Sequence, residues 1–154
     1  MSSKSSKLIR FTATVPVARP VNDVFAYTAD PRNFPDWNSA VESVVAASPL
    51  VTGTGMRYVM RRQLPGGEAI NELEVIAHDS PSAFAIRTTS GPTPFAYRYR
   101  FEPADGGTRI TLLAEVELTG VASIAGPLAA RVVKRGVEAN FATLRSILER
   151  RPLA

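Results

Sequence analysis

The 154-residue chain contains no cysteine and a single histidine. Without cysteine, disulfide bonds, thiolate nucleophiles and cysteine-based zinc or iron–sulfur sites are excluded. His78 follows a strand-like segment beside Asp79, Ser80 and Pro81, where we expect a solvated turn residue rather than a general base. The chain also lacks the His-Glu-x-x-His and Gly-x-Ser-x-Gly patterns of zinc and serine hydrolases. We therefore predict no catalytic residue, no metal site and no cofactor.

Long apolar runs are also missing, so no segment is long enough to span a bilayer. Residues 1–7 are polar and lack the apolar core of a signal peptide. We interpret 1–7 as a flexible basic arm, 8–150 as a single domain and 151–154 as a tail. These features favour a cytoplasmic protein without stable membrane insertion.

Neither sign of charge dominates the chain, which has 18 basic and 14 acidic residues and a net charge of +4. The basic residues are spread over the arm, the strands and the last helix, with acidic residues between them. Such a distribution gives a weak preference for anions. We therefore expect no nucleic-acid partner.

What the sequence does contain is one long amphipathic segment at 121–150, in which apolar residues recur at steps of three to five and charged residues lie between them. This spacing predicts a single helix with one apolar stripe. The stripe consists of Leu128, Val132, Val133, Val137, Phe141, Leu144 and Leu148. Small residues such as Ala129, Ala130 and Gly136 interrupt its first half, so we expect unfilled space between this half and its packing partner.

The expected partner is a sheet. A strand at 8–15 is followed by two short helices, near 20–30 and 31–34. Six further strand-like runs lie at 41–47, 56–64, 68–77, 83–89, 95–102 and 108–118. Their short connections predict an antiparallel meander. The predicted fold is α+β, a seven-stranded antiparallel sheet curved around a long C-terminal helix, with two short helices between strands one and two.

The register of one hairpin can be predicted from its turn at 65–67. Pairing Leu64 with Gly67 sets Tyr58 opposite Leu73 and places Glu74 on the outer face. A slip of one residue would turn Glu74 inward and make the interior acidic. Which face of 68–77 points inward therefore stays open.

Several local runs match a known pattern: VPV at 15–17, PVNDVF at 20–25, DPRNFPDW at 30–37, GTG at 53–55, and the closing helix with Leu144 and Leu148. From residue 8 onward the chain resembles the START-like, helix-grip superfamily, specifically its polyketide cyclase/dehydrase and lipid-transport branch. The resemblance implies a sheet that grips a long helix around an apolar cavity. Because this superfamily includes carriers, receptors, cyclases, co-chaperones and toxins, it does not fix the chemistry.

Candidate cavity residues follow from strand parity. Tyrosines on inward faces can pack a ring and still donate a hydrogen bond to a ligand, although they can equally be ordinary sheet aromatics. Trp37 either closes the cavity mouth or packs the short helices on the sheet. Arg62 shares the parity of Tyr58 and could reach the cavity rim to meet a ligand carboxylate or enolate, but we expect it to extend into solvent at the strand end. The predicted ligand-binding residues are Trp37, Met56, Tyr58, Met60, Leu73, Phe84, Ile86, Tyr97, Tyr99, Leu112, Ala114, Leu128 and Val132.

We expect the protein to bind a small apolar or aromatic molecule, lipid or polyketide-like, as a carrier or sequestering protein. The alternative is a polyketide cyclase/aromatase-like enzyme that acts by positioning its substrate and polarising a carbonyl. Convergence of two polar side chains on one point in the cavity would favour the enzyme. An interaction protein that uses the outer surface is a third possibility. The identity of the ligand and the existence of a homodimer stay open.

Overall fold

The computed structural model describes residues 6–49, 53–64, 66–120, 123 and 126–152. The predicted fold class is confirmed, with elements in the expected order. In chain order these are β1 (Ser6–Val17), α1 (Val21–Thr28), the 3₁₀ turn η1 (Pro31–Asn33), α2 (Phe34–Trp37), β2 (Val41–Ala46), β3 (Arg57–Leu64), β4 (Gly67–Asp79), β5 (Ala83–Ser90), β6 (Phe95–Ala104), β7 (Gly107–Thr119) and α4 (Gly126–Arg150).

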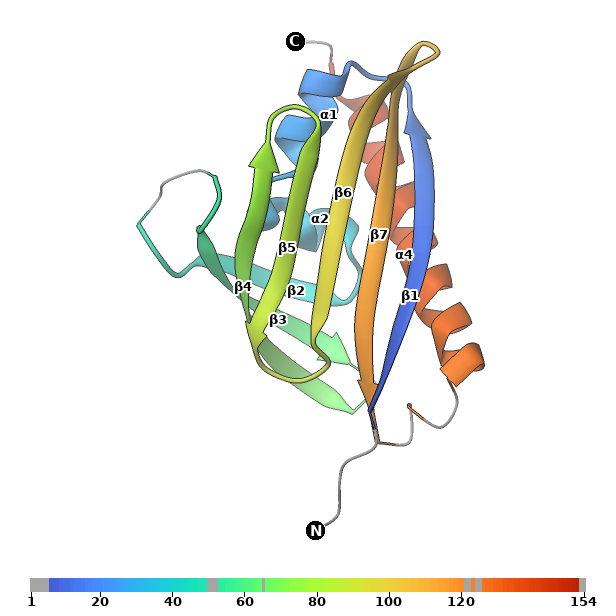
Figure 1. The fold of residues 1–154 in the computed structure, drawn as a ribbon. Helices are drawn as coiled ribbons and strands as arrows, with labels where there is room; N and C mark the ends of the chain where they lie inside the picture. The colour runs from blue at the N-terminus through green and yellow to red at the C-terminus, as the bar shows by residue number, and fades with distance from the viewer. Residues whose placement is uncertain (1–5, 50–52, 65, 121–122, 124–125, 153–154) are drawn as a thin grey trace.

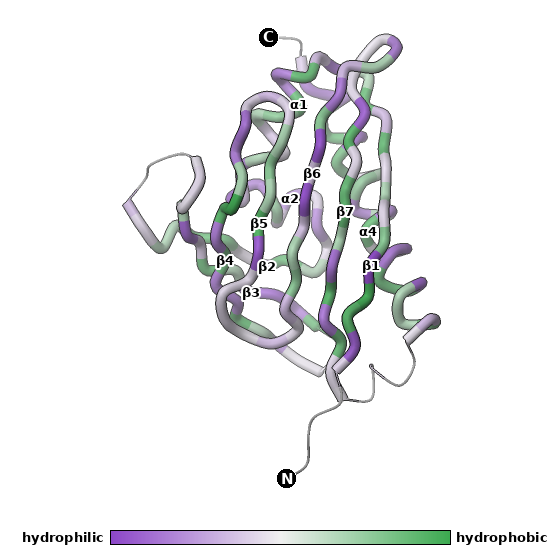
Figure 2. Tube along the Cα trace, in the orientation of Figure 1, coloured by the Kyte–Doolittle hydropathy of each residue, from purple (hydrophilic) through white to green (hydrophobic). Residues whose placement is uncertain are grey.

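One seven-stranded antiparallel sheet has the order β1-β7-β6-β5-β4-β3-β2. The helices lie together on one side of it, behind the sheet in Figure 1, and α4 runs beside β1. Hydrophilic and hydrophobic residues alternate along the central strands (Figure 2), as expected when one face of a sheet is covered and the other meets solvent. The covered face therefore carries the core.

Several predicted boundaries change. Ser6 and Lys7 pair with Thr119 and Leu118, so β1 begins two residues before the predicted strand at 8–15 and ends two residues after it. Residues 1–5 of the predicted arm and 153–154 of the predicted tail lie outside the described residues. The same holds for 50–52 and 65 in two predicted turns and for 121–122 and 124–125 of the predicted helix, and α4 is described from Gly126 onward.

The register predicted for the β3–β4 hairpin is confirmed, with Leu64 opposite Gly67 and Tyr58 opposite Leu73. Leu73 is fully buried. The outward Glu74 lies 3.6 Å from the guanidinium of Arg87 on β5. The inward face of β4 is therefore the apolar one.

Three irregularities bend the sheet. The pairing register shifts twice between β4 and β5, at Glu72/Leu73 and at Val75/Ala77, and once between β2 and β3. Such bulges kink a strand and increase its twist. They curve β2, β3 and β4 around the helices, which gives the covered face its concave shape (Figure 1).

The large side chains of α4 that are buried in the core lie from Val137 onward, whereas Ala129, Ala130 and Val133 are only partly buried against it. Val137, Phe141, Leu144 and Leu148 are buried, all at most 8% exposed. The predicted stripe is wrong for Leu128 and Val132, which are 65% and 63% exposed. Apolar steps of three to five are compatible with more than one helical face. At 100° per residue, Leu128 and Val137 lie on opposite sides of the helix.

His78 also differs from its prediction. It belongs to β4, which continues to Asp79, and is half-buried rather than a solvated turn residue. Its ring meets Phe25 of α1 edge to face at 5.2 Å and Phe84 of β5 at 6.2 Å. The longer strand thus places the imidazole among aromatic rings.

Hydrogen bonds connect the C-terminus of α4 to the segment after β1. Nη2 of Arg19 donates hydrogen bonds to the carbonyl oxygens of Glu149 and Arg151. The backbone N–H of Ala18 donates to the Glu149 carboxylate at 2.8 Å. A cation that satisfies terminal carbonyl groups also complements the negative end of the helix dipole.

Candidate functional site

A cavity of about 330 Å³ lies between the concave face of the sheet and the first half of α4. The helix contributes Val132, Val133, Gly136, Val137 and Asn140 to its wall. A Cβ atom added to Gly136 would meet no atom within 4 Å, so this glycine leaves open space. The sheet contributes Met60, Arg62, Leu64, Ile86, Phe95, Tyr97, Tyr99, Val116 and Leu118.

Two tyrosines on β6 are among the polar residues of this wall. The Tyr97 ring lies 4.6 Å from Phe95 and 6.3 Å from Tyr99. Neither tyrosine hydroxyl has a hydrogen-bond partner within the described residues. Burial raises the pKa of Tyr97 to about 12 and that of Tyr99 well above its usual value. Both phenols therefore stay neutral at physiological pH and can donate to a ligand oxygen.

Arg62 lies at one end of the cavity instead of extending into solvent, so that prediction is corrected. Its Nε donates to Oδ1 of Asn71 at 2.9 Å, and its Nη2 donates to the carbonyl oxygens of Pro92 and Thr93 at 3.0 and 3.2 Å. Nη1 makes no hydrogen bond within the part of the chain that the structure describes. Burial lowers the pKa of Arg62, yet an arginine remains charged at neutral pH. The guanidinium thus keeps donors available for a ligand.

Asn71 holds Arg62 in this position. The Asn71 side chain is fully buried, and its Nδ2 donates to the carbonyl oxygens of Ser90 and Pro92 at 3.1 and 2.8 Å. Gly91 has φ +98° and leaves no room for a Cβ against the Ile70 carbonyl oxygen. Glycine is required there for both reasons. The β5–β6 turn can therefore pack directly against the side-chain amide of Asn71.

Arg62 and Tyr97 both line the cavity, and both lie beside the Phe95 ring. The positive charge of Arg62 lowers the pKa of Tyr97, against the larger effect of burial. The guanidinium carbon also lies 5.2 Å from the ring centre of Phe95. A ligand oxygen beside Phe95 can approach a cation and a phenol, whereas much of the remaining wall is apolar.

Trp37 lines the cavity and packs α2 against the core, and this packing is one of the two roles considered for it. It is 4% exposed, and its ring lies 5.5 Å from Phe34 and 6.3 Å from Phe141 of α4. Beside it, Oδ1 of Asn140 accepts hydrogen bonds from the backbone N–H and hydroxyl of Ser39 at 3.2 and 3.4 Å. These contacts join α4 to the segment between α2 and β2.

The cavity brings together some of the predicted site residues and leaves out others. Those in its lining are Trp37, Met60, Ile86, Tyr97, Tyr99 and Val132. The residues Met56, Leu73, Leu112 and Ala114 are buried in the core outside the lining. Leu128 is exposed and also outside the lining, contrary to its prediction. Phe84 is buried but borders a different hollow, between β5, β6 and β7.

Tyr58 is separated from the other two tyrosines. It borders a hollow of about 310 Å³ between α1 and β4, together with Asp30, Arg32 and His78. Burial and the negative charge of Asp30 raise its pKa. No group of three or more His, Asp or Glu side chains that could hold a metal ion occurs within the described residues.

Sequence reasoning missed several members of the cavity wall, namely Phe95, Val116, Leu118, Val133, Gly136 and Asn140. Strand parity already places Phe95, Val116 and Leu118 inward. Strand parity tells which face of the sheet a residue lies on. It does not tell at which position along the strand the helix stops covering that face. That position depends on the curvature of the sheet and on the rotation of α4.

No helix in the described part of the chain combines the length and the apolar content needed to cross a membrane.

Comparison with known proteins supports the same architecture. A protein from Mycobacterium tuberculosis is 28% identical over 116 residues, which cover 73% of this chain and 68% of the relative. The crystal structure of the Zhui aromatase/cyclase from Streptomyces sp. R1128 has a TM-score of 0.75 and 21% identity, and covers 94% of this chain and 96% of its own. A START superfamily protein from Mycobacterium smegmatis has a TM-score of 0.76 and 13% identity, over 91% and 97% of the two chains.

These structural likenesses show the START-like helix-grip fold. The sequence model of the family described as polyketide cyclase/dehydrase and lipid transport matches residues 9–149, nearly the whole chain. The chain therefore belongs to the polyketide cyclase/dehydrase and lipid transport family.

Proposed function

We propose that the protein binds a small apolar or aromatic molecule in the cavity between the sheet and α4, as a carrier or sequestering protein. The observation that carries this proposal is the cavity of about 330 Å³ with a largely apolar, aromatic wall. Its volume lies at the lower end of the roughly 300–1,000 Å³ typical of ligand pockets. Burial of apolar ligand surface supplies affinity. The hydroxyls of Tyr97 and Tyr99 supply orientation.

The test uses native mass spectrometry of the freshly purified protein, followed by binding of an apolar fluorescent dye such as anilinonaphthalene sulfonate. Gly136→Phe would place a ring in the open space beside this glycine, whereas Gly136→Ala adds one methyl group there. We expect the Phe variant to lose at least about tenfold in dye affinity and the Ala variant to retain it. Equal binding by both folded variants, or no binding by the wild-type protein, would reject the cavity as the ligand site.

A second function is favoured by one specific observation, the position of Arg62 and Tyr97 in one cavity wall, both beside the Phe95 ring. A guanidinium and a phenol aimed at one carbonyl oxygen can stabilise the enolate that develops when a poly-β-keto chain cyclises. The protein would then act as a polyketide cyclase/aromatase-like enzyme, with the apolar wall folding the chain. The Zhui structure, with 21% identity, shows a shared fold rather than a shared reaction.

The two functions can be separated with a synthetic poly-β-keto thioester, whose cyclised products are analysed with and without the protein. An enzyme should change the product pattern. Arg62→Met and Tyr97→Phe should each abolish this change while dye binding persists, because the dye needs mainly the apolar wall. An unchanged product pattern with the wild-type protein would reject the enzyme function, and the carrier function would be the one that remains.

A further inference from the structure

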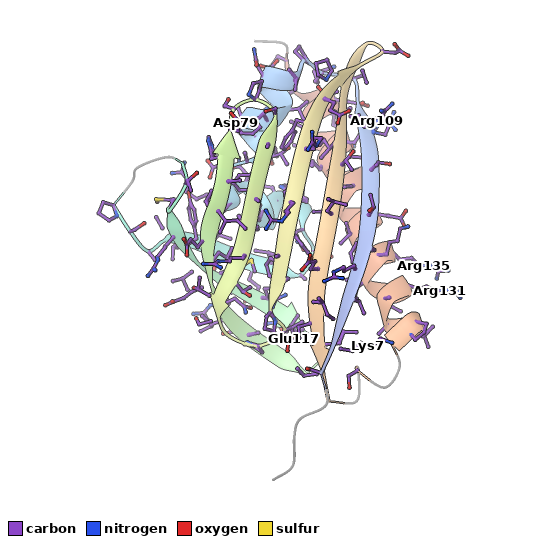
Figure 3. The ribbon with its side chains drawn as sticks, viewed as in Figure 1. Lys7, Asp79, Arg109, Glu117, Arg131 and Arg135 are labelled. Atoms are coloured by element: carbon purple, nitrogen blue, oxygen red, sulfur yellow. The ribbon has the colours of Figure 1, made fainter. Side chains whose placement is uncertain are left out.

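The first half of α4 presents a mixed apolar and cationic surface to solvent. Leu128 and Val132 are 65% and 63% exposed, and Arg131 and Arg135 between and beside them are also exposed. Residues spaced i, i+3, i+4 and i+7 lie on one face of a helix. Leu128, Arg131, Val132 and Arg135 therefore form one continuous strip, here called the α4 ridge. Figure 3 shows Arg131 and Arg135 on the side of α4 that faces away from β1.

The charge along the ridge itself is positive, and the first acidic residue on this face, Glu138, follows one turn after Arg135. Residues 126–137 contain Arg131, Lys134 and Arg135 and no acidic residue. None of these three cations forms an ion pair within the described residues. The side chain of Lys7 lies against Gly126 at the start of the helix, which places another cation at this end. The surface therefore attracts anions and leaves its basic groups available to bind them.

The ridge lies at the mouth of the cavity. Val132 is 63% exposed and also lines the cavity, so this side chain marks a boundary between the cavity and the outside. Val133 and Gly136, next to it on the helix, belong to the same wall. A partner that covers the ridge would thus also lie over the opening.

We propose that the α4 ridge docks the protein on an anionic lipid bilayer. Leu128 and Val132 enter the boundary between head groups and acyl chains, and Arg131 and Arg135 bind lipid phosphates, in the manner of an interfacial amphipathic helix. A bilayer fits this surface better than an acidic protein does. The apolar side chains project from a convex helix, and a folded protein would need a matching apolar recess for them. Docking of this kind does not require an occupied cavity.

The experiment is co-sedimentation of the full chain with vesicles of pure phosphatidylcholine and with vesicles that also contain phosphatidylglycerol. We expect binding to the anionic vesicles that falls as salt is added, and weak binding to the neutral ones. Leu128→Gln and the double variant Arg131→Gln/Arg135→Gln should each weaken it by about tenfold or more. Matched controls are Val45→Gln on β2, where the valine is 58% exposed, and Arg98→Gln on the outer face of β6. Both should bind like the wild-type protein.

Three outcomes would overturn the proposal: equal binding to both kinds of vesicle, ridge variants that bind like the wild-type protein, or binding to soluble polyglutamate but to no vesicle. The last result would identify an acidic protein as the partner. Dye binding without vesicles is measured in parallel, because Leu128 lies outside the cavity lining. If the wild-type protein binds the dye but no vesicle, the docking surface alone is rejected. If it binds anionic vesicles but no dye, the ligand cavity alone is rejected.

Discussion

Arg62 on β3 and Asn71 on β4 are joined by a hydrogen bond of 2.9 Å between Nε and Oδ1. Asn71 is the cross-strand partner of Met60, two residues before Arg62, so the guanidinium reaches its acceptor diagonally across the sheet. The same buried amide donates to Ser90 and Pro92 on the next turn. One side chain thus fixes both the cation at the end of the cavity and the loop beside it.

We therefore expect Asn71→Ala to lower the free energy of unfolding by about 2–4 kcal/mol, because it leaves buried hydrogen-bonding groups unpaired and opens a small cavity. Urea denaturation measures the loss. Arg61→Ala is the matched control, since its ion pair with Glu68 is exposed and should contribute at most about 1 kcal/mol. Similar effects of the two substitutions would show that the amide has no structural role of this kind.

Stability should fall at high pH because of Tyr97. Its pKa is about 12 in the folded protein, mainly through burial, and about 10 in an unfolded chain. The stabilisation is fully present below pH 10 and is lost as pH rises from 10 to 12, by about 3 kcal/mol at most. Urea denaturation at several pH values measures this loss. Tyr97→Phe should show a shallower fall, and identical slopes for the two proteins would contradict the burial of this phenol.

The two halves of α4 should respond differently to truncation. Leu144→Ala removes a fully buried side chain and should cost about 2–5 kcal/mol in unfolding free energy. Leu128→Ala removes an exposed one and should change it by at most about 0.5 kcal/mol. Thermal or urea unfolding of the two variants gives the comparison. A large loss of unfolding free energy from Leu128→Ala would show that Leu128 packs in the core, as the sequence predicted.

Gly136→Ala should stabilise the protein. The glycine lies in the interior of α4, and an added Cβ would meet no atom within 4 Å. Alanine in a helix interior is favoured over glycine by about 0.5–1 kcal/mol, and a higher melting temperature would report it. A destabilised variant would show that the space beside this glycine is not open.

Arg19→Met tests the fastening of the C-terminus of α4. The substitution removes the donor to the carbonyl oxygens of Glu149 and Arg151 and should cost about 1–3 kcal/mol. Arg109→Met on β7 is the control, because Arg109 is exposed and forms no ion pair among the described residues. Equal urea midpoints for the two variants would contradict a capping role for Arg19.

Local patterns predicted the parts of the fold that depend on local geometry. The β3–β4 register follows from a short turn and an apolar face, so Tyr58 opposite Leu73 could be predicted. The buried half of α4 could be predicted as well, because Phe141, Leu144 and Leu148 are large and leave one plausible face.

Features that depend on distant segments could not be predicted. The face of Leu128 is set by how the sheet curves beneath the helix, and the bulges that curve it have no clear sequence signature. Arg62 turns inward because Asn71 and the turn at Pro92 offer it acceptors. These partners lie 9 and 30 residues away in sequence. Parity alone could not distinguish that arrangement from a side chain extended into solvent.

The uneven packing of α4 has a consequence for its motion. Its last half is held by buried side chains and by Arg19, whereas its first half has only partly buried contacts and lies beside the cavity. Local opening should therefore require less free energy near Val133 than near Leu144. Amide hydrogen exchange should be graded along this one helix, fastest beside the cavity. The segment that closes the ligand space is then also the segment that can open it, without unfolding the rest of the domain.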